Sequence, residues 1–207
     1  MVTATARGWN RREFMGAAGL VALAFGLPAA AVTLSSLDPA TAPTPAQRAL
    51  FREVSQLVLP RTRTPGAGDV GAGDFVLLAL AHGLDGARQP LAQPTPALLP
   101  HLRPDGTLDH AAWLEAELNR RAGGRFLRAA GRAGILAALD AEAYAEGRRD
   151  HPWRTVKGLI LTGYYTTEIG GAQELRYELV PGRWEPDLPA TPQTVAYSSD
   201  WTAVDFG

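Results

Sequence analysis

Proline and glycine divide this chain into short segments, and no other feature of the sequence limits its fold so strongly. The 207 residues include 16 prolines and 22 glycines. Both residue types interrupt regular secondary structure and mark turns and loops. We therefore expect a mainly α fold: a small, irregular helical domain with long loops. Strand character is thin throughout and is confined to residues 175–180.

The first 31 residues have the layout of an export signal. Arg11 and Arg12 are followed by Phe14, and residues 16–27 form a short run of small and apolar side chains. Small residues at 28–31 suit a signal peptidase. Paired arginines of this kind indicate the twin-arginine route to the periplasm. An uncleaved membrane anchor is the alternative, but the apolar run is well short of the ~20 residues that a transmembrane helix needs.

The rest of the chain contains several short helical patterns. Thr44, Pro45 and Gln47 form a capping box with proline at the first helical position. Apolar spacing predicts a helix that begins at Pro45 and is ended by Pro60, and further helices at 74–82, 109–122 and 125–146, with Gly83 closing the helix at 74–82. One more helix is predicted to begin at Pro152, with an inward face made of Trp153, Val156, Ile160 and Tyr164. We divide the chain into a signal at 1–31, a linker at 32–44, a helical domain at 45–170 and an irregular C-terminal extension at 171–207.

Composition excludes several kinds of chemistry. The chain has no cysteine, so it cannot form disulfides, attach haem c covalently or hold a cysteine-ligated cluster. The net charge of −1 is too small to indicate binding to nucleic acid. The four histidines have no spacing that would place two of them on one helical face, and surface or core roles are favoured over a metal site. They are His82, His101, His110 and His151.

Two further patterns resemble catalytic or cofactor motifs. Gly66, Gly68 and Gly71 match G-x-G-x-x-G, but no buried strand precedes them, so we expect a flexible glycine loop without a dinucleotide. Asp140 and Glu142 lie two positions apart on a predicted helix and therefore diverge, which favours a solvated face over an acid/base pair. The sequence assigns no catalytic, cofactor-binding or metal-binding residue.

The end of the chain is rich in aromatic residues and arginines. This composition is typical of the residues that anchor protein interfaces. The alternative is that the aromatic side chains fold back and complete the chain's own core. The candidate interface residues are Tyr164, Tyr165, Glu168, Arg176, Tyr177, Arg183, Trp184 and Trp201.

Several short segments, in this order, resemble the gluconate 2-dehydrogenase subunit 3 family. The resemblance covers the chain from about residue 47 to its end and is weakest at 84–124. The segments are LVLP at 57–60, TPGA at 64–67, WRTVKGLI at 153–160, GYYTTEIG at 163–170, QELRY at 173–177, VPGR at 180–183 and SSDW at 198–201.

This resemblance implies a non-catalytic small subunit that accompanies a large FAD-containing subunit of the glucose–methanol–choline type, in some complexes with a c-type cytochrome. Such complexes oxidise sugars, polyols or glycosides at the periplasmic face of the inner membrane. The small subunit is expected to reach the membrane only through the complex and to aid export and assembly. Residues 170–172 and 185–187 depart from the gluconate-type pattern, so gluconate is not assumed as the substrate. A free-standing binding or scaffold protein, or a metal-dependent enzyme, is the alternative.

Overall fold

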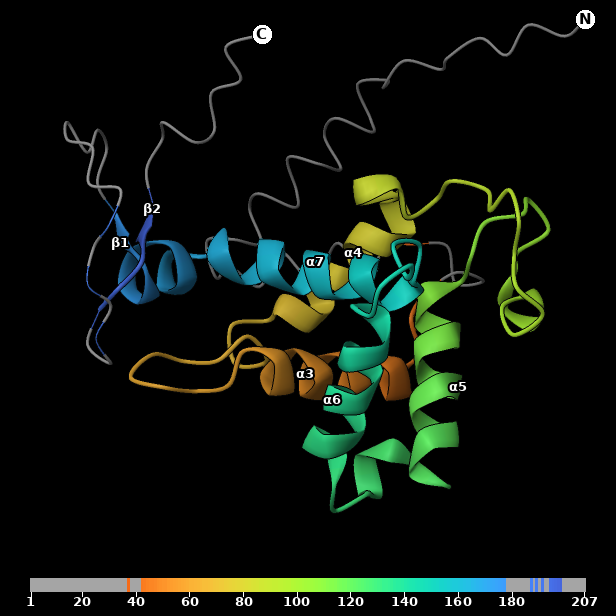
Figure 1. The fold of residues 1–207 in the computed structure, drawn as a ribbon, viewed down its shortest axis with the longest axis horizontal. Helices are drawn as coiled ribbons and strands as arrows, with labels where there is room; N and C mark the ends of the chain where they lie inside the picture. Colours follow the sequence, from red (N-terminus) through yellow and green to blue (C-terminus); the bar gives the residue numbers. More distant parts are fainter. Residues whose placement is uncertain are drawn as a thin grey trace, which may run out of the picture.

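The computed structural model describes residues 37, 42–177, 187, 189, 191 and 194–198, and within them the fold is mainly helical (Figure 1). The predicted signal at 1–31 lies outside the described residues. The α-helices are α3 (Pro45–Val58), α4 (Ala72–His82), α5 (His110–Ala122), α6 (Arg132–Ala143) and α7 (Pro152–Tyr165). Shorter elements are the 3-10 helices η1 (Leu84–Gly86), η2 (Leu99–His101) and η3 (Phe126–Arg128), the π-helix η4 (Ile169–Glu174), and the strands β1 (Arg176–Tyr177) and β2 (Tyr197–Ser198).

The start of α3 follows directly from its sequence. The Thr44 hydroxyl accepts the Gln47 N–H at 3.1 Å, and the Gln47 side chain accepts the Thr44 N–H at 2.9 Å. These two hydrogen bonds satisfy backbone donors that the first helical turn would otherwise leave unpaired. The helix ends at Val58, two residues before Pro60. The predicted capping box and helix are therefore confirmed.

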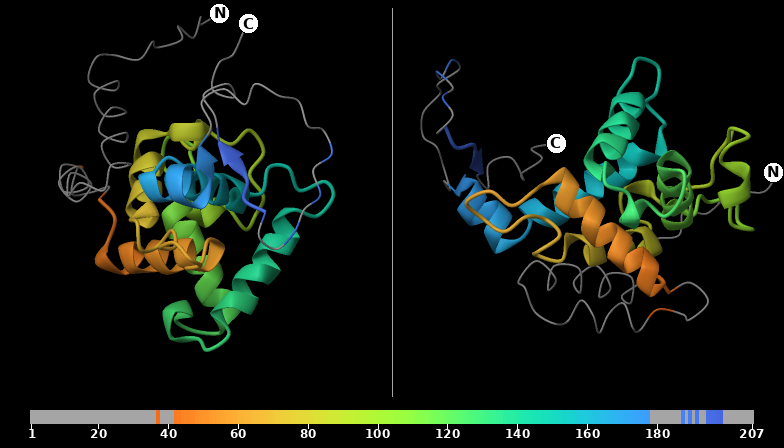
Figure 2. Two further views of the ribbon diagram at one scale, coloured as in Figure 1. Left: turned by 90° about the vertical axis from the view of Figure 1, so that its left-hand side faces the viewer. Right: turned by 90° about the horizontal axis from the view of Figure 1, so that it is seen from below.

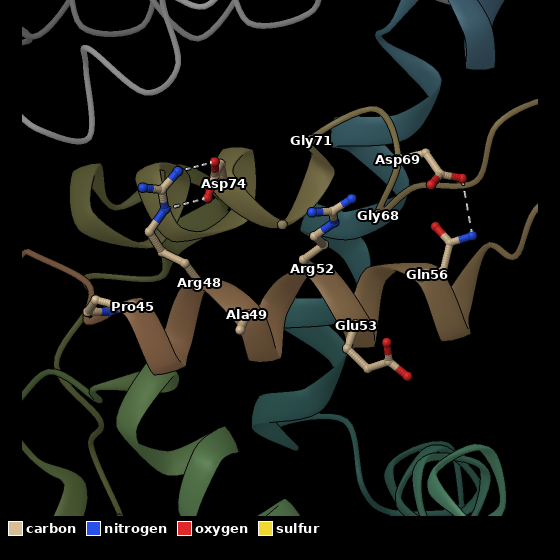
Figure 3. Close-up of a pocket in the computed structure, with 11 residues that line it drawn as sticks. Pro45, Arg48, Ala49, Arg52, Glu53, Gln56, Gly68, Asp69, Gly71 and Asp74 are labelled. Carbon is tan, nitrogen blue, oxygen red and sulfur yellow. Dashed lines mark hydrogen bonds and ion pairs between the residues drawn. The ribbon is translucent and has the colours of Figure 1, made fainter. Parts of the chain in front are cut away.

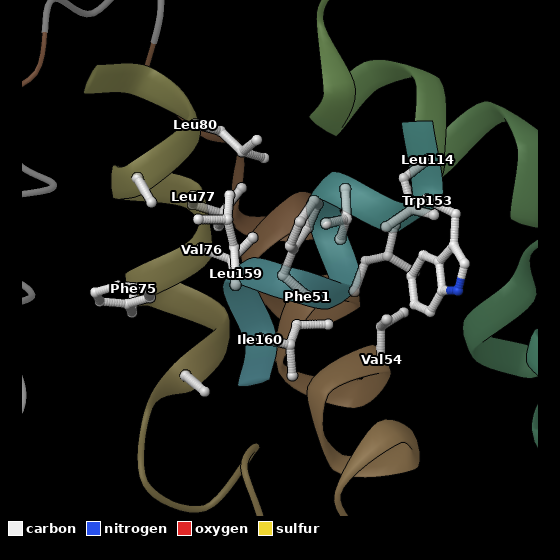
Figure 4. Close-up of a cluster of buried hydrophobic side chains, with 14 of the residues drawn as sticks. Phe51, Val54, Phe75, Val76, Leu77, Leu80, Leu114, Trp153, Leu159 and Ile160 are labelled. Atoms are coloured by element: carbon white, nitrogen blue, oxygen red, sulfur yellow. The ribbon is translucent and has the colours of Figure 1, made fainter. Parts of the chain in front are cut away.

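Helix α7 crosses the centre of the molecule, with α3 and α4 packed against it and against each other (Figures 1 and 2). Helices α5 and α6 form an antiparallel pair that also contacts α7. The core lies at these crossings, where Phe51 and Val54 of α3 meet the inward face of α7 (Figure 4). The predicted inward face of α7 is confirmed, because the side chains of all four of its residues are buried: Trp153, Val156, Ile160 and Tyr164.

Two predictions about secondary structure are corrected by the structure. The helix predicted at 125–146 is shorter: η3 occupies Phe126–Arg128, and α6 begins only after Gly131, whose φ of −94° and ψ of 30° are not helical. Strand structure within 175–180 is limited, in the described residues, to β1, which pairs in parallel with β2. In the first case Gly131 interrupts the apolar spacing that predicted one long helix. In the second case the preference of residues 175–180 for strand depends on neighbouring strands, and only a short pairing forms.

Glycine allows α3 and α4 to lie unusually close together. A Cβ atom on Gly73 would lie 2.6 Å from the Arg52 amide nitrogen and 2.7 Å from the Phe51 carbonyl carbon. Both atoms belong to the α3 backbone, so they cannot move aside as a flexible side chain could. The distance between α3 and α4 therefore depends on the absence of a side chain at Gly73.

Alanine at position 73 is expected to lower the free energy of unfolding by about 1–3 kcal/mol, because it forces the two helices apart. Gly134 supplies a matched control in α6, since a Cβ there would meet no atom within 4 Å. Gly134→Ala is expected to raise the free energy of unfolding by about 0.5–1 kcal/mol through helix propensity alone. Urea denaturation followed by circular dichroism measures both changes. Equal effects of the same sign would contradict the close approach.

Candidate functional site

The candidate interface residues divide into a buried and an exposed group. Tyr164 is only 3% exposed, and its hydroxyl donates a hydrogen bond to the Pro65 carbonyl at 3.0 Å. Tyr165, the next residue, is 37% exposed and packs edge-on against the Tyr164 ring at 5.2 Å between centroids. Tyr164 therefore supports this end of α7 from inside, and Tyr165 presents its ring to solvent.

The π-helix η4 turns the chain back immediately after α7. A Cβ atom on Gly170 would lie 2.2 Å from the Tyr164 carbonyl oxygen, and one on Gly171 would lie 2.8 Å from the Tyr165 carbonyl oxygen. Only glycine allows the backbone to pass so close to the end of α7. π-Helices are rare and frequently occur at functional sites. This segment therefore has a specific geometry that its two glycines make possible.

A carboxylate joins η4 to the loop that follows α3. Glu174 accepts hydrogen bonds from the hydroxyls of Thr64 and Thr62, the latter at 3.3 Å. Burial raises the pKa of the Tyr165 hydroxyl, and the negative charge of Glu174 raises it further. Sequence reasoning missed this contact, because Thr64 and Glu174 lie 110 residues apart and no local pattern links them.

The remaining candidate interface residues follow η4 or lie outside the described residues. Glu168 is exposed. Arg176 lies over the exposed ring of Tyr197 at 5.5 Å, where β1 and β2 pair. Only the backbone of Tyr177 is described, opposite Ser198. The predicted site residues that fall outside the described part of the chain are Arg11, Arg12, Phe14, Arg183, Trp184 and Trp201.

The glycine motif at 66–71 serves packing. A Cβ atom on Gly68 would lie 2.5 Å from the Arg52 carbonyl oxygen, and one on Gly66 would lie 2.7 Å from the Leu59 carbonyl oxygen. Both glycines are buried against α3, so the expectation of a flexible loop is wrong. No strand precedes them in the described residues, and Gly71 caps α4 with a left-handed φ of 84°. The segment therefore does not fit a dinucleotide.

An open groove of about 780 Å³ lies between α3 and this glycine segment (Figure 3). Arg48 holds Asp74 through two hydrogen bonds of 3.0 and 2.7 Å. Gln56 donates to Asp69 at 3.3 Å on the other side of the groove. The first contact ties α4 to α3, and the second ties the glycine segment to α3. These groove carboxylates therefore act as partners for polar side chains of the same chain.

The histidines and carboxylates singled out in the sequence have structural partners. His151 accepts the Trp153 N–H at 3.2 Å through Nδ1 and so caps α7, and partial burial lowers its pKa. Asp140 accepts hydrogen bonds from the Trp153 indole and from Lys157, both at 2.7 Å. The expectation of a purely solvated face is therefore wrong for Asp140. Glu142 pairs with a different residue, Arg121, at 2.6 Å.

The described residues contain no group of three or more histidine or acidic side chains arranged to hold a metal ion. None of the described helices combines the length and apolar character needed to cross a membrane.

The described residues form a small helical fold in which the last turn of α7 exposes the Tyr165 ring. The chain belongs to the gluconate 2-dehydrogenase subunit 3 family, whose model matches residues 45–182. The family is named for a small subunit of a dehydrogenase complex, and the match runs from the start of α3 through β1. No curated protein and no solved structure matches the chain.

Proposed function

We propose that this chain is the non-catalytic small subunit of a periplasmic, FAD-dependent dehydrogenase of the glucose–methanol–choline type. The complex would oxidise a sugar, polyol or glycoside. The FAD belongs to the large subunit, and a c-type cytochrome is a third subunit in some arrangements. The observation that carries this proposal is the family match over residues 45–182, preceded by the paired arginines Arg11 and Arg12.

In this proposal the subunit aids the folding, assembly and twin-arginine export of the flavoprotein. The chain has no cysteine, so its folding does not depend on an oxidising compartment. Folding before export, which the twin-arginine route requires, is therefore compatible with its composition. The flavoprotein would travel with the folded small subunit and reach the periplasmic face of the inner membrane as a complex.

The proposed interface combines exposed residues of the described end with residues of the C-terminal extension. Tyr165, Glu168 and Arg176 are exposed in the structure. Tyrosine and arginine are common among the side chains that contribute most to binding. Tyr177, Arg183, Trp184 and Trp201 extend the proposed interface along the chain. Tyr164 supports the interface from the core and does not contact the partner directly.

The double substitution Arg11→Lys and Arg12→Lys tests the export function. We expect both this chain and its flavoprotein to remain in the cytoplasm, because the paired arginines address the complex to the export machinery. Cell fractionation followed by immunoblotting and periplasmic dye-linked dehydrogenase activity measures the result. Arg7→Lys, which lies outside the pair, is the matched control and should export normally. A flavoprotein that still reaches the periplasm in the double variant would show that this chain does not carry it.

A further inference from the structure

The end of the molecule beside η4 is built from two segments that lie far apart in the sequence. The first segment is the loop at 59–65, which follows α3. The second segment is the end of α7 together with η4, and it lies beside this loop (Figures 1 and 2). The hydrogen bonds from Thr62 and Thr64 to Glu174 fix the loop against η4. The Tyr164 hydroxyl holds the same loop at Pro65. The two segments therefore form one assembled surface, which we call the η4 face.

The η4 face presents two exposed charged side chains, one on the loop and one directly before η4. Arg63 lies between the two threonines that hold the loop, and it is exposed. Within the described residues, neither the Arg63 guanidinium nor the Glu168 carboxylate makes an ion pair or a side-chain hydrogen bond. Most other charged groups beside this surface and along α3 are paired, as Arg61 is with Asp69. Arg63 directly precedes Thr64, whose hydroxyl lies 3.4 Å from that of Tyr164. Glu168 follows the exposed Tyr165 by three residues.

This combination is typical of a surface that binds another protein. Arginine and tyrosine anchor interfaces because each side chain joins a large contact area with directional hydrogen bonding. A surface that is already assembled loses less conformational entropy on binding than a mobile loop would. The described residues 194–198 lie at the same end, because β2 pairs with β1 directly after η4.

We infer that the η4 face receives the flavoprotein subunit, with Arg63 and Tyr165 as anchors and Glu174 as the residue that positions the loop. This inference rests on the proposed function and assigns the partner to a defined surface. The complementary surface of the flavoprotein would offer a carboxylate to Arg63, an apolar recess to the Tyr165 ring and a cation to Glu168. The loop at 59–65 thereby becomes part of the interface.

The affinity of the full-length small subunit for its flavoprotein tests this assignment. Arg63→Glu and Tyr165→Ala are each expected to weaken binding by roughly tenfold or more, measured by biolayer interferometry with immobilised flavoprotein. Arg125→Glu and Tyr144→Ala are matched controls, since both residues are exposed and lie in the α5–α6 region, away from η4. The controls are expected to bind within about twofold of the unaltered chain.

Substitutions at Glu174 separate positioning from direct contact. Glu174→Ala removes the acceptor for both threonine hydroxyls and should weaken binding by several-fold. Glu174→Gln keeps an acceptor oxygen and should restore most of the affinity. In Thr62→Val with Thr64→Val, the Glu174→Ala change should have little further effect, because the hydrogen bonds are already absent. A further loss of the same size would show that Glu174 touches the partner itself, and would overturn its positioning role.

The outcomes distinguish this inference from the proposed function. If the unaltered chain does not bind a flavoprotein, the proposed function itself fails. If the unaltered chain binds but Arg63→Glu and Tyr165→Ala behave like the controls, the flavoprotein docks elsewhere and the η4 face is wrongly assigned. Analytical ultracentrifugation of the small subunit alone tests whether a second copy of this chain binds the η4 face instead. A stable dimer that Arg63→Glu dissociates would assign the face to a second copy of this chain.

Discussion

Replacing Trp153 with alanine is expected to lower the free energy of unfolding by about 3–5 kcal/mol. Trp153 has 0% exposure and is the largest fully buried side chain of the described core. Its indole N–H also donates to Asp140 at 2.7 Å. The substitution removes a large apolar volume at the centre of the helix crossings, where the surrounding backbone cannot collapse completely. Urea denaturation of the full chain, followed by far-ultraviolet circular dichroism, measures the change.

Trp153→Phe separates the hydrogen bond from the packing. Phenylalanine retains most of the aromatic volume but has no indole N–H. Asp140 still accepts a hydrogen bond from Lys157 at 2.7 Å, so its carboxylate keeps a partner. We therefore expect a smaller loss, on the order of 1–2 kcal/mol. If Trp153→Ala lowers the free energy of unfolding by less than about 1 kcal/mol, the indole does not fill the core.

Acidification is expected to destabilise the fold through His110. This imidazole is 8% exposed at the start of α5, and burial lowers its pKa from 6.5 to about 4. The positive charge of Arg103 contributes to this lowering of the pKa, while the Leu108 carbonyl and Asp109 act in the opposite direction. The folded state therefore favours the neutral imidazole, and protonation opposes folding.

The direction of the pH effect follows from these two values. Above pH 6.5 the imidazole is neutral in both states, and its contribution to stability is complete. As the pH falls from 6.5 toward 4, the unfolded chain takes up a proton that the folded chain does not, so stability is lost. The loss reaches about 3 kcal/mol near pH 4. Below that value the folded state also binds the proton, and no further loss comes from His110.

The variant His110→Gln isolates this contribution. Glutamine does not titrate, so the difference between the unaltered chain and the variant removes the effects of carboxylates and of His151. In urea titrations at several pH values, the free energy of unfolding of the unaltered chain should fall by about 3 kcal/mol relative to that of the variant between pH 6.5 and 4. Parallel pH profiles would show that the His110 imidazole takes up a proton in the folded protein as readily as in the unfolded one.

Local signals in the sequence predicted much of the helical domain. Thr44 and Gln47 marked the start of α3, Gly83 marked the end of α4, and the spacing from Trp153 to Tyr164 identified the buried face of α7. Each of these features depends on residues within one or two helical turns of one another. A short stretch of sequence is therefore enough to predict these helix ends and buried faces.

Features that depend on distant backbone contacts could not be predicted in the same way. The glycines at 66 and 68 resembled a loop motif, but their role depends on the α3 backbone. The π-helix requires Gly170 because the Tyr164 carbonyl oxygen lies beneath it, and no period in the sequence indicates this. No local pattern singled out Glu174, because its partner Thr64 lies 110 residues away in the sequence. The candidate interface predicted from the sequence therefore did not include the loop at 59–65.

Helix α7 links the interior of this protein to its exposed end. Its first turn contains Trp153 in the core, and its last turn places Tyr164 beneath the loop at 59–65. A chain whose core has not closed cannot seat Tyr164, and without that support the loop and η4 have no fixed relation to each other. If the flavoprotein binds at this end, then only a correctly folded small subunit can be recognised by it. Binding to the flavoprotein would thus select folded small subunits before the complex leaves the cytoplasm. Misfolded copies would stay in the cytoplasm without the action of a separate quality-control protein.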